Sequence, residues 1–309
     1  MDELLSASEG SHSASQKVKL LRIGNIVSLL FCFGAIIVGL LVHPNIAEVG
    51  EANPSYLTLP NLFVNIFWAI LFPLQFGFVL YAQFNALHVV QEAVSRGINW
   101  YFIASNLLIP GWILFWCKEE FAISEIFIIL NTIAITKIHR NLIIYYPPST
   151  NSHLNSFKLI TFIHTPFSMY AALTLLDVLH VGFVAFAGTD REYQILACIA
   201  VWALAIVGIG WTTVGLWSDG RRDSVFGISI AWILLGIAVQ QRSVLFLSIQ
   251  AITLAIIQVH TAQDRYLNGG HYYKTIKNDY MMEMKTIEFM SLLQSLGVGS
   301  LGSRYSLNR

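Results

Sequence analysis

An acidic side chain and an imidazole lie three residues apart inside a long apolar stretch of the chain. Asp177 and His180 occur in the run MYAALTLLDVLHVGFVAF, and on a helix this spacing places them on one face. An ionisable side chain inside a bilayer is costly, so it normally faces the interior of a helix bundle. Such a pair could share a proton, bind a cation or receive a hydrogen bond from a ligand. The alternative is an internal pair that only fixes helix packing.

Other polar and aromatic residues sit where they could join this pair. Glu125 begins the run EIFIILNTIAIT and is expected at a similar depth, so it could meet Asp177 or His180. Asn65 and Trp68 share one face of another apolar run, where they could pack or line a cavity. Deep tryptophans can fill a core or line a pocket for a flat hydrophobic ligand. We therefore predict a ligand site formed by Asp177, His180, Glu125, Trp112, Trp68 and Asn65.

The elements that must position these residues are expected to be transmembrane helices. Hydrophobic residues make up 55% of the chain and charged residues 12%, which is unlike a soluble domain. Each apolar stretch is about as long as a helix needs to be to cross a bilayer. The sequence thus predicts an all-α, polytopic bundle of about eight spans, at residues 23–42, 62–83, 99–117, 121–138, 159–187, 194–217, 224–240 and 242–262.

The basic residues predict the orientation of this bundle. When the connecting segments are assigned alternately to two sides, 15 of the 18 Lys and Arg residues fall on one side. The positive-inside rule makes that side cytosolic, so both termini are expected in the cytosol. The expected organisation is a disordered leader over residues 1–22, a helix bundle over 23–262 and a cytosolic tail over 263–309. The tail either includes an amphipathic helix or is loosely ordered throughout.

Composition and motifs exclude several classes of function. The three cysteines are dispersed and flanked by apolar residues, which argues against a disulfide framework and a metal cluster. We find no Gly-rich phosphate loop, no HExxH or GxSxG motif and no basic stripe suited to nucleic acid. No cofactor is indicated. An intramembrane enzyme and an adaptor that works through its tail stay open as alternatives to a ligand-binding protein.

Several ordered segments resemble one known family. They are NPSYLTLPNLFVNIFWAILFPLQFGFVLY, NWYFIASNLLIPGWILFWCKEEF, FIHTPFSMYAALTLLDVLHV and DSVFGISIAWILLGIAV. Together they are similar to the extended tryptophan-rich sensory protein (TspO/benzodiazepine-receptor-type) group. Small members of that group are five-helix bundles that bind porphyrins and sterol-like ligands in a Trp-lined pocket. The resemblance implies a similar bundle with extra helices. It also implies two partners, namely the lipid bilayer and a small hydrophobic ligand.

The sequence departs from the family pattern at two places. Ile109 stands where an Asn often precedes the Trp of the third span, and Asp177 and His180 occupy a stretch that is usually uncharged. These differences could mark a site of the protein's own. Several spans are short, which slightly favours a thin membrane such as that of the endoplasmic reticulum.

Overall fold

The computed structural model describes residues 2–146, 153–187, 192–216 and 220–263, and they form helices joined by turns. The labelled elements are α1 (Asp2–Leu41), α2 (Ile46–Ala52), α3 (Asn61–Phe84), α4 (His88–Glu92), the π-helix η1 (Ala93–Ile98), α5 (Tyr101–Cys117), α6 (Phe121–Tyr145), α7 (His153–Leu159), the π-helix η2 (Ile160–His164), α8 (Thr165–Phe186), α9 (Tyr193–Thr213) and α10 (Ser224–Gln240). A further helix, Leu245–Gln263, follows. The remainder of the predicted tail lies outside the described residues.

Six of the described helices are long and apolar enough to cross a membrane. Their outward faces carry exposed Leu, Ile, Val and Phe side chains, as lipid contact requires. The protein is therefore an integral, multi-pass membrane protein. The six candidate spans are Gln16–Leu41, Asn61–Phe84, Phe121–Tyr145, Asn155–Phe186, Tyr193–Thr213 and Leu245–Gln263.

The structure differs from the predicted count of about eight spans at two helices. α5 reaches crossing length only together with His88–Ile98, and this pair is bent by 49°. The bend falls at Asn99, whose φ of 50° lies in the left-handed region and interrupts the helix. α10 has 17 residues and is a shorter apolar helix. The described residues therefore hold six candidate spans, or seven if the bent pair is one span.

The first helix also differs from its prediction. α1 begins at Asp2, so it runs through the segment expected to be a disordered leader. The leader has no proline that would stop a helix, which makes this continuation sterically possible. Only the part from Gln16 onward is apolar enough to count as a candidate span.

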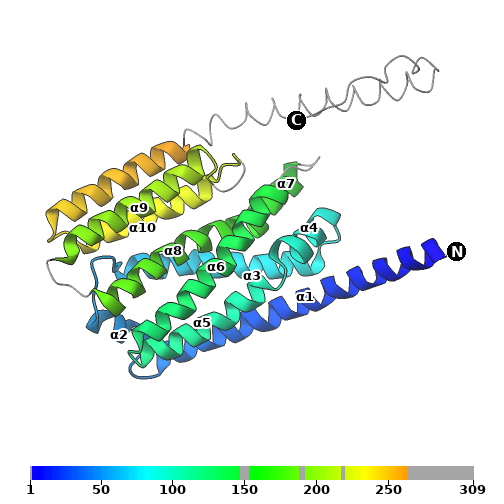
Figure 1. Cartoon of the computed structure of the whole chain (residues 1–309), viewed down its shortest axis with the longest axis horizontal. Helices are drawn as coiled ribbons and strands as arrows, with labels where there is room; N and C mark the ends of the chain where they lie inside the picture. The colour runs from blue at the N-terminus through cyan, green and yellow to red at the C-terminus, as the bar shows by residue number, and fades with distance from the viewer. Residues whose placement is uncertain (1, 147–152, 188–191, 217–219, 264–309) are drawn as a thin grey trace, which may run out of the picture. The chain divides into compact units, whose positions relative to one another are not determined.

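The helices of residues 2–262 pack in a series that sets up the interior. α1 packs on α5, α5 on α6, α6 on α8, α8 on α10 and α10 on α9. Figure 1 shows this succession, with α3 lying alongside α8. The last helix joins α9 and α10, because Gln258 donates a hydrogen bond to Thr212 and Ser248 donates one to the carbonyl of Ala238. α6 and α8 therefore form the middle of the bundle.

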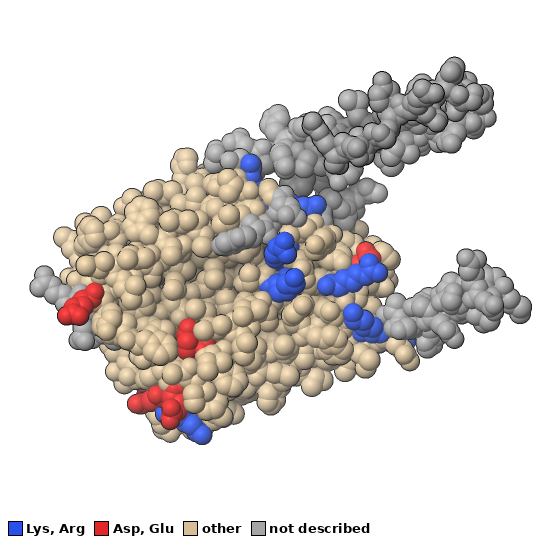
Figure 2. All heavy atoms as spheres, viewed as in Figure 1, with Lys and Arg blue, Asp and Glu red and all other residues tan. Residues whose placement is uncertain are grey.

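Charged residues separate along the described helices. Figure 2 shows most of the visible Lys and Arg side chains at the α4 and α7 end of the bundle, and most of the visible Asp and Glu side chains toward the opposite end, near α2. α2 itself begins with a capping box, in which Asn45 Oδ1 accepts hydrogen bonds from the N–H groups of Ala47 and Glu48. The return bond from the Asn45 N–H holds the pKa of Glu48 below its usual value.

Candidate functional site

Glu125 is buried where α6 packs on α8. Only 7% of Glu125 is exposed. A Cβ atom placed on Gly182 of α8 would lie 3.5 Å from Glu125 Oε1, so the missing side chain of this glycine leaves room for the carboxylate. Asp177 lies five residues before Gly182 on α8, and no hydrogen bond or ion pair of the described residues joins it to Glu125. The meeting of these two predicted site residues stays a prediction.

His180 uses its ring for other contacts. Its Nδ1 lies 2.9 Å from Ser55 Oγ, in the loop between α2 and α3, and the two atoms share a hydrogen bond. The centroid of its ring is 5.9 Å from that of Trp116. The ion pairs of the described residues do not include Asp177 and His180. His180 therefore holds the α2–α3 loop against α8.

Two tryptophans of α5 extend this region. The ring centroids of Trp112 and Trp116 are 6.1 Å apart, and Trp116 Nε1 donates a hydrogen bond of 3.2 Å to the carbonyl of Ile46. Within the described chain, the buried Nε1 of Trp112 has no hydrogen-bond partner. We call Glu125, Asp177, His180, Trp112 and Trp116 the carboxylate cluster.

The two remaining predicted site residues lie on α3. Trp68 stacks on Phe72 with ring centroids 4.8 Å apart and meets the edge of Tyr170 at 6.1 Å. The described hydrogen bonds, ion pairs and ring contacts do not join Trp68 to the carboxylate cluster. Asn65 is exposed on α3. Among the described contacts none brings Asn65 to the cluster.

A hydrogen-bonded chain of polar residues is centred on Asn131, which lies six residues after Glu125 on α6. Ser105 Oγ donates a bond of 2.6 Å to Asn131 Oδ1, and Asn131 Nδ2 donates one of 3.2 Å to the Tyr170 hydroxyl. These bonds join α5, α6 and α8. Asn131 lies in the same apolar run as Glu125, and its partners from the other two helices were not predicted.

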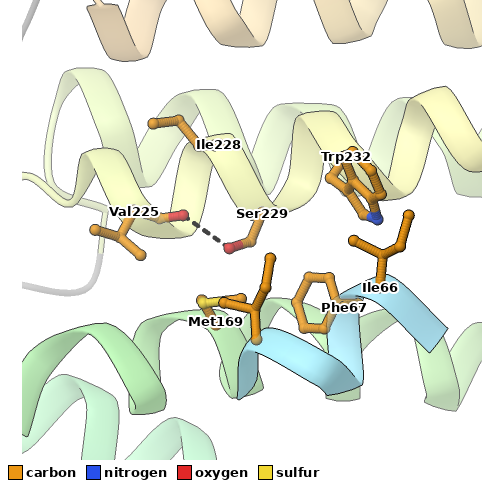
Figure 3. A pocket seen from close by; sticks show the side chains of 8 residues that line it. Ile66, Phe67, Met169, Val225, Ile228, Ser229 and Trp232 are labelled. Atoms are coloured by element: carbon orange, nitrogen blue, oxygen red, sulfur yellow. Dashed lines mark hydrogen bonds between the residues drawn. The ribbon is translucent and has the colours of Figure 1, made fainter. Parts of the chain in front are cut away.

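The sequence did not predict the position of an apolar cavity between α3, α8 and α10. Its volume is about 260 Å³, and it is lined by Ile66, Phe67, Ile70, Met169, Val225, Ile228, Ser229 and Trp232. Figure 3 shows Met169 and Phe67 facing Ser229 and Trp232 across it. Trp232 Nε1 donates a hydrogen bond of 3.2 Å to the carbonyl of Phe63, so the indole is held by α3. Trp232 is one of the deep tryptophans of the sequence, but it was not among the predicted site residues.

A buried His–Asp pair at the start of α10 was also missed. His139 Nε2 lies 2.7 Å from Asp223 Oδ2, and the two side chains are 1% and 9% exposed. The ring of His139 also stacks on Phe226, with centroids 5.3 Å apart. Asp223 directly precedes an apolar run, which is the signal of a helix cap. Its partner was hidden because the fourth span was predicted to end at residue 138, one residue short of His139.

The described residues contain no group of three or more His, Cys, Asp and Glu side chains that could hold a metal ion. A family model for TSPO-like proteins matches residues 19–262. Curated proteins and solved structures give no match.

Proposed function

Because the chain belongs to the TSPO-like protein family, we propose that it binds a small hydrophobic ligand inside its membrane-embedded helix bundle. The observation that carries this proposal is the cavity between α3, α8 and α10. Its volume of about 260 Å³ is close to the lower end, about 300 Å³, of the range found for small-molecule sites. The ligand is therefore a small molecule or one segment of a larger lipid.

The chemistry of the lining favours an apolar ligand. Seven of the eight lining residues are Ile, Val, Met, Phe or Trp. The eighth, Ser229, donates its hydroxyl hydrogen to the carbonyl of Val225, so that proton is already engaged within α10. Trp232 offers a large aromatic face whose orientation is fixed by its bond to Phe63. Because the side chains of such a site are already ordered, less binding free energy is lost in ordering them when the ligand binds.

Filling the cavity from its exposed edge tests the proposal. Ile228 is 55% exposed and lines the cavity, so Ile228→Trp adds bulk there with little effect on the core. Ile206 of α9 is 59% exposed and is not a lining residue, so Ile206→Trp is the matched control. We expect native mass spectrometry of the full chain to detect a co-purified small molecule in the unmodified protein and in Ile206→Trp, and to detect much less in Ile228→Trp. Equal retention in all three proteins would count against this cavity.

The carboxylate cluster is the second candidate region for the ligand. It is favoured by the buried Trp112 Nε1 and Glu125 Oε2, which have no hydrogen-bond partner among the described residues. We propose Asp177, His180, Glu125, Trp112, Trp68 and Asn65 as ligand contacts in that case. Asp177→Asn and His180→Ala would then abolish binding while the protein still folds, and Ile228→Trp would leave binding unchanged.

We further propose eight membrane crossings with both termini in the cytosol. α10 and the bent α4–α5 unit supply the two crossings beyond the six long helices. The side that holds 15 of the 18 basic residues then faces the cytosol. The shortness of α10, at 17 residues, favours the endoplasmic reticulum.

A further inference from the structure

The cavity between α3, α8 and α10 opens sideways toward the lipid. Three of its lining side chains are also exposed on the outer surface of the bundle: Ile66 is 37%, Ile70 50% and Ile228 55% exposed. Ile66 and Ile70 lie one turn apart, so they share one face of α3. Because α3 is a candidate membrane span, that face contacts lipid chains. A ligand can therefore enter the cavity from within the bilayer, between α3 and α10.

The lining of the cavity suits a hydrocarbon chain. On α10 it extends from Val225 to Trp232, which is about 10 Å along a helix and follows the direction of the lipid chains around a membrane span. Both polar hydrogens of the lining are engaged, because Ser229 donates to the carbonyl of Val225 and Trp232 donates to the carbonyl of Phe63. A polar group of a ligand would find no donor to replace its bonds to water, which costs free energy.

The start of α10 places basic side chains close to this lining. Arg221 Nη1 donates a hydrogen bond of 3.1 Å to the carbonyl of Ile143, near the end of α6, and the next residue, Arg222, is exposed. Arg222 precedes Val225 by three positions, so their Cα atoms lie within about 11 Å of each other. Basic side chains at the end of a membrane helix attract anionic lipid head groups. An acyl chain in the cavity can therefore belong to a lipid whose head group lies at these arginines.

We propose that the cavity holds one acyl chain of an anionic phospholipid, which enters from the bilayer between α3 and α10, and that the phosphate of this lipid lies at Arg222. The inference rests on the proposed function of the cavity and names the chemical class of its ligand. The head group stays at the water interface while one chain exchanges its lipid neighbours for the side chains of the lining. A free fatty acid has the same two chemical parts, so the experiment includes both ligands.

Native mass spectrometry of the full chain, stripped of lipid in detergent and titrated with defined lipids, tests the proposal. The probes are dioleoyl phosphatidylserine, dioleoyl phosphatidylcholine and oleate. We expect the unmodified protein to retain one phosphatidylserine at collision energies that remove phosphatidylcholine. Ile228→Trp and Ile70→Trp fill the cavity from two different helices, and each should remove this retained lipid. Arg222→Gln should weaken the binding of phosphatidylserine about fivefold, the effect of one basic side chain on an anionic head group.

Matched variants serve as controls. Ile206→Trp, on an exposed part of α9, and Arg242→Gln, at the other end of α10, should bind phosphatidylserine as the unmodified protein does. The double variant Ile228→Trp/Arg222→Gln should bind it no more weakly than Ile228→Trp alone, because both changes act on one lipid. Circular dichroism checks that each variant is folded.

Three results would overturn the proposal. The first is unchanged retention of phosphatidylserine in both cavity variants, and the second is an equal effect of Arg222→Gln and Arg242→Gln. The third is preferential binding of oleate, which would assign the cavity to a free fatty acid. If an uncharged co-purified molecule is lost in Ile228→Trp while phosphatidylserine binding is unaffected, the cavity still binds a hydrophobic ligand and only the phospholipid assignment fails.

Discussion

Asp223 uses its two carboxylate oxygens for two different partners. Oδ1 accepts hydrogen bonds from the N–H groups of Val225 and Phe226 and caps α10. Oδ2 is 2.7 Å from His139 Nε2 on α6. One residue therefore starts a helix and attaches that helix to the middle of the bundle. Removing one member of such a buried pair leaves the other polar group unsatisfied, which is more costly than never having the pair.

The substitution Asp223→Ala should therefore destabilise the protein more than Asp223→Asn. Alanine cannot cap the helix, which lowers the free energy of unfolding by about 1 kcal/mol. It also leaves His139 Nε2 without this hydrogen-bond partner, which lowers that free energy by a further amount of about 1–3 kcal/mol. Asparagine keeps a capping oxygen and can still hydrogen-bond His139. Thermal unfolding of the detergent-solubilised proteins measures the difference. Equal unfolding temperatures of the two variants would mean that neither the cap nor the hydrogen bond to His139 adds to stability.

At the scale of the helices, Gly227 determines how closely α10 approaches its neighbours. A Cβ atom on Gly227 would lie 2.3 Å from Thr212 Oγ1 of α9 and 2.7 Å from Gln258 Nε2 of the last helix. Both atoms belong to the hydrogen bond that joins those two helices. Close approach at a small residue is how membrane helices gain packing contacts.

Gly227→Ala should accordingly push α10 outward and lower stability by about 1–3 kcal/mol, the typical cost of overpacking. Gly34→Ala in α1 is the matched control, because a Cβ atom there meets nothing within 4 Å. Since alanine favours a helix more than glycine does, the control should be neutral or slightly stabilised. A denaturation series in mild detergent compares the stabilities of the two variants. Equal stabilities would mean that the contact between α9 and α10 accommodates an additional methyl group without strain.

The helix pattern also shows what sequence could and could not predict. The apolar runs that became α3 and α9 are long, so their existence and approximate ends were predicted, whereas α6 was predicted to begin correctly but to end at 138 rather than at Tyr145. The bend at Asn99 depends on one residue adopting a positive φ, which no periodic pattern reveals. Depth along the helices led us to expect Glu125 near Asp177 or His180, and this stays a prediction. The outward position of Asn65 and the inward position of Ser105 depend on which neighbours each helix acquires, and that information is not local.

For the molecule as a whole, the segregation of charge makes a prediction about topology. If the basic side is cytosolic, a cysteine introduced at exposed Glu51, near α2, should react with a membrane-impermeant maleimide from the outer or lumenal side. A cysteine at exposed Lys17, at the other end of α1, should react only after the membrane is opened. Cys32, Cys117 and Cys198 are replaced by serine or alanine beforehand. The opposite labelling pattern would reverse the proposed orientation.

The central claim is that a hydrophobic ligand occupies the cavity between α3, α8 and α10. Photolabelling with a small alkyl diazirine in native-like membranes, followed by peptide mapping, locates such a ligand directly. We predict that labels concentrate on Ile66, Ile70, Met169, Ile228 and Trp232 and that Ile228→Trp removes them. Labels that spread evenly over lipid-exposed faces such as that of α9, or that gather instead at the carboxylate cluster, would contradict the claim.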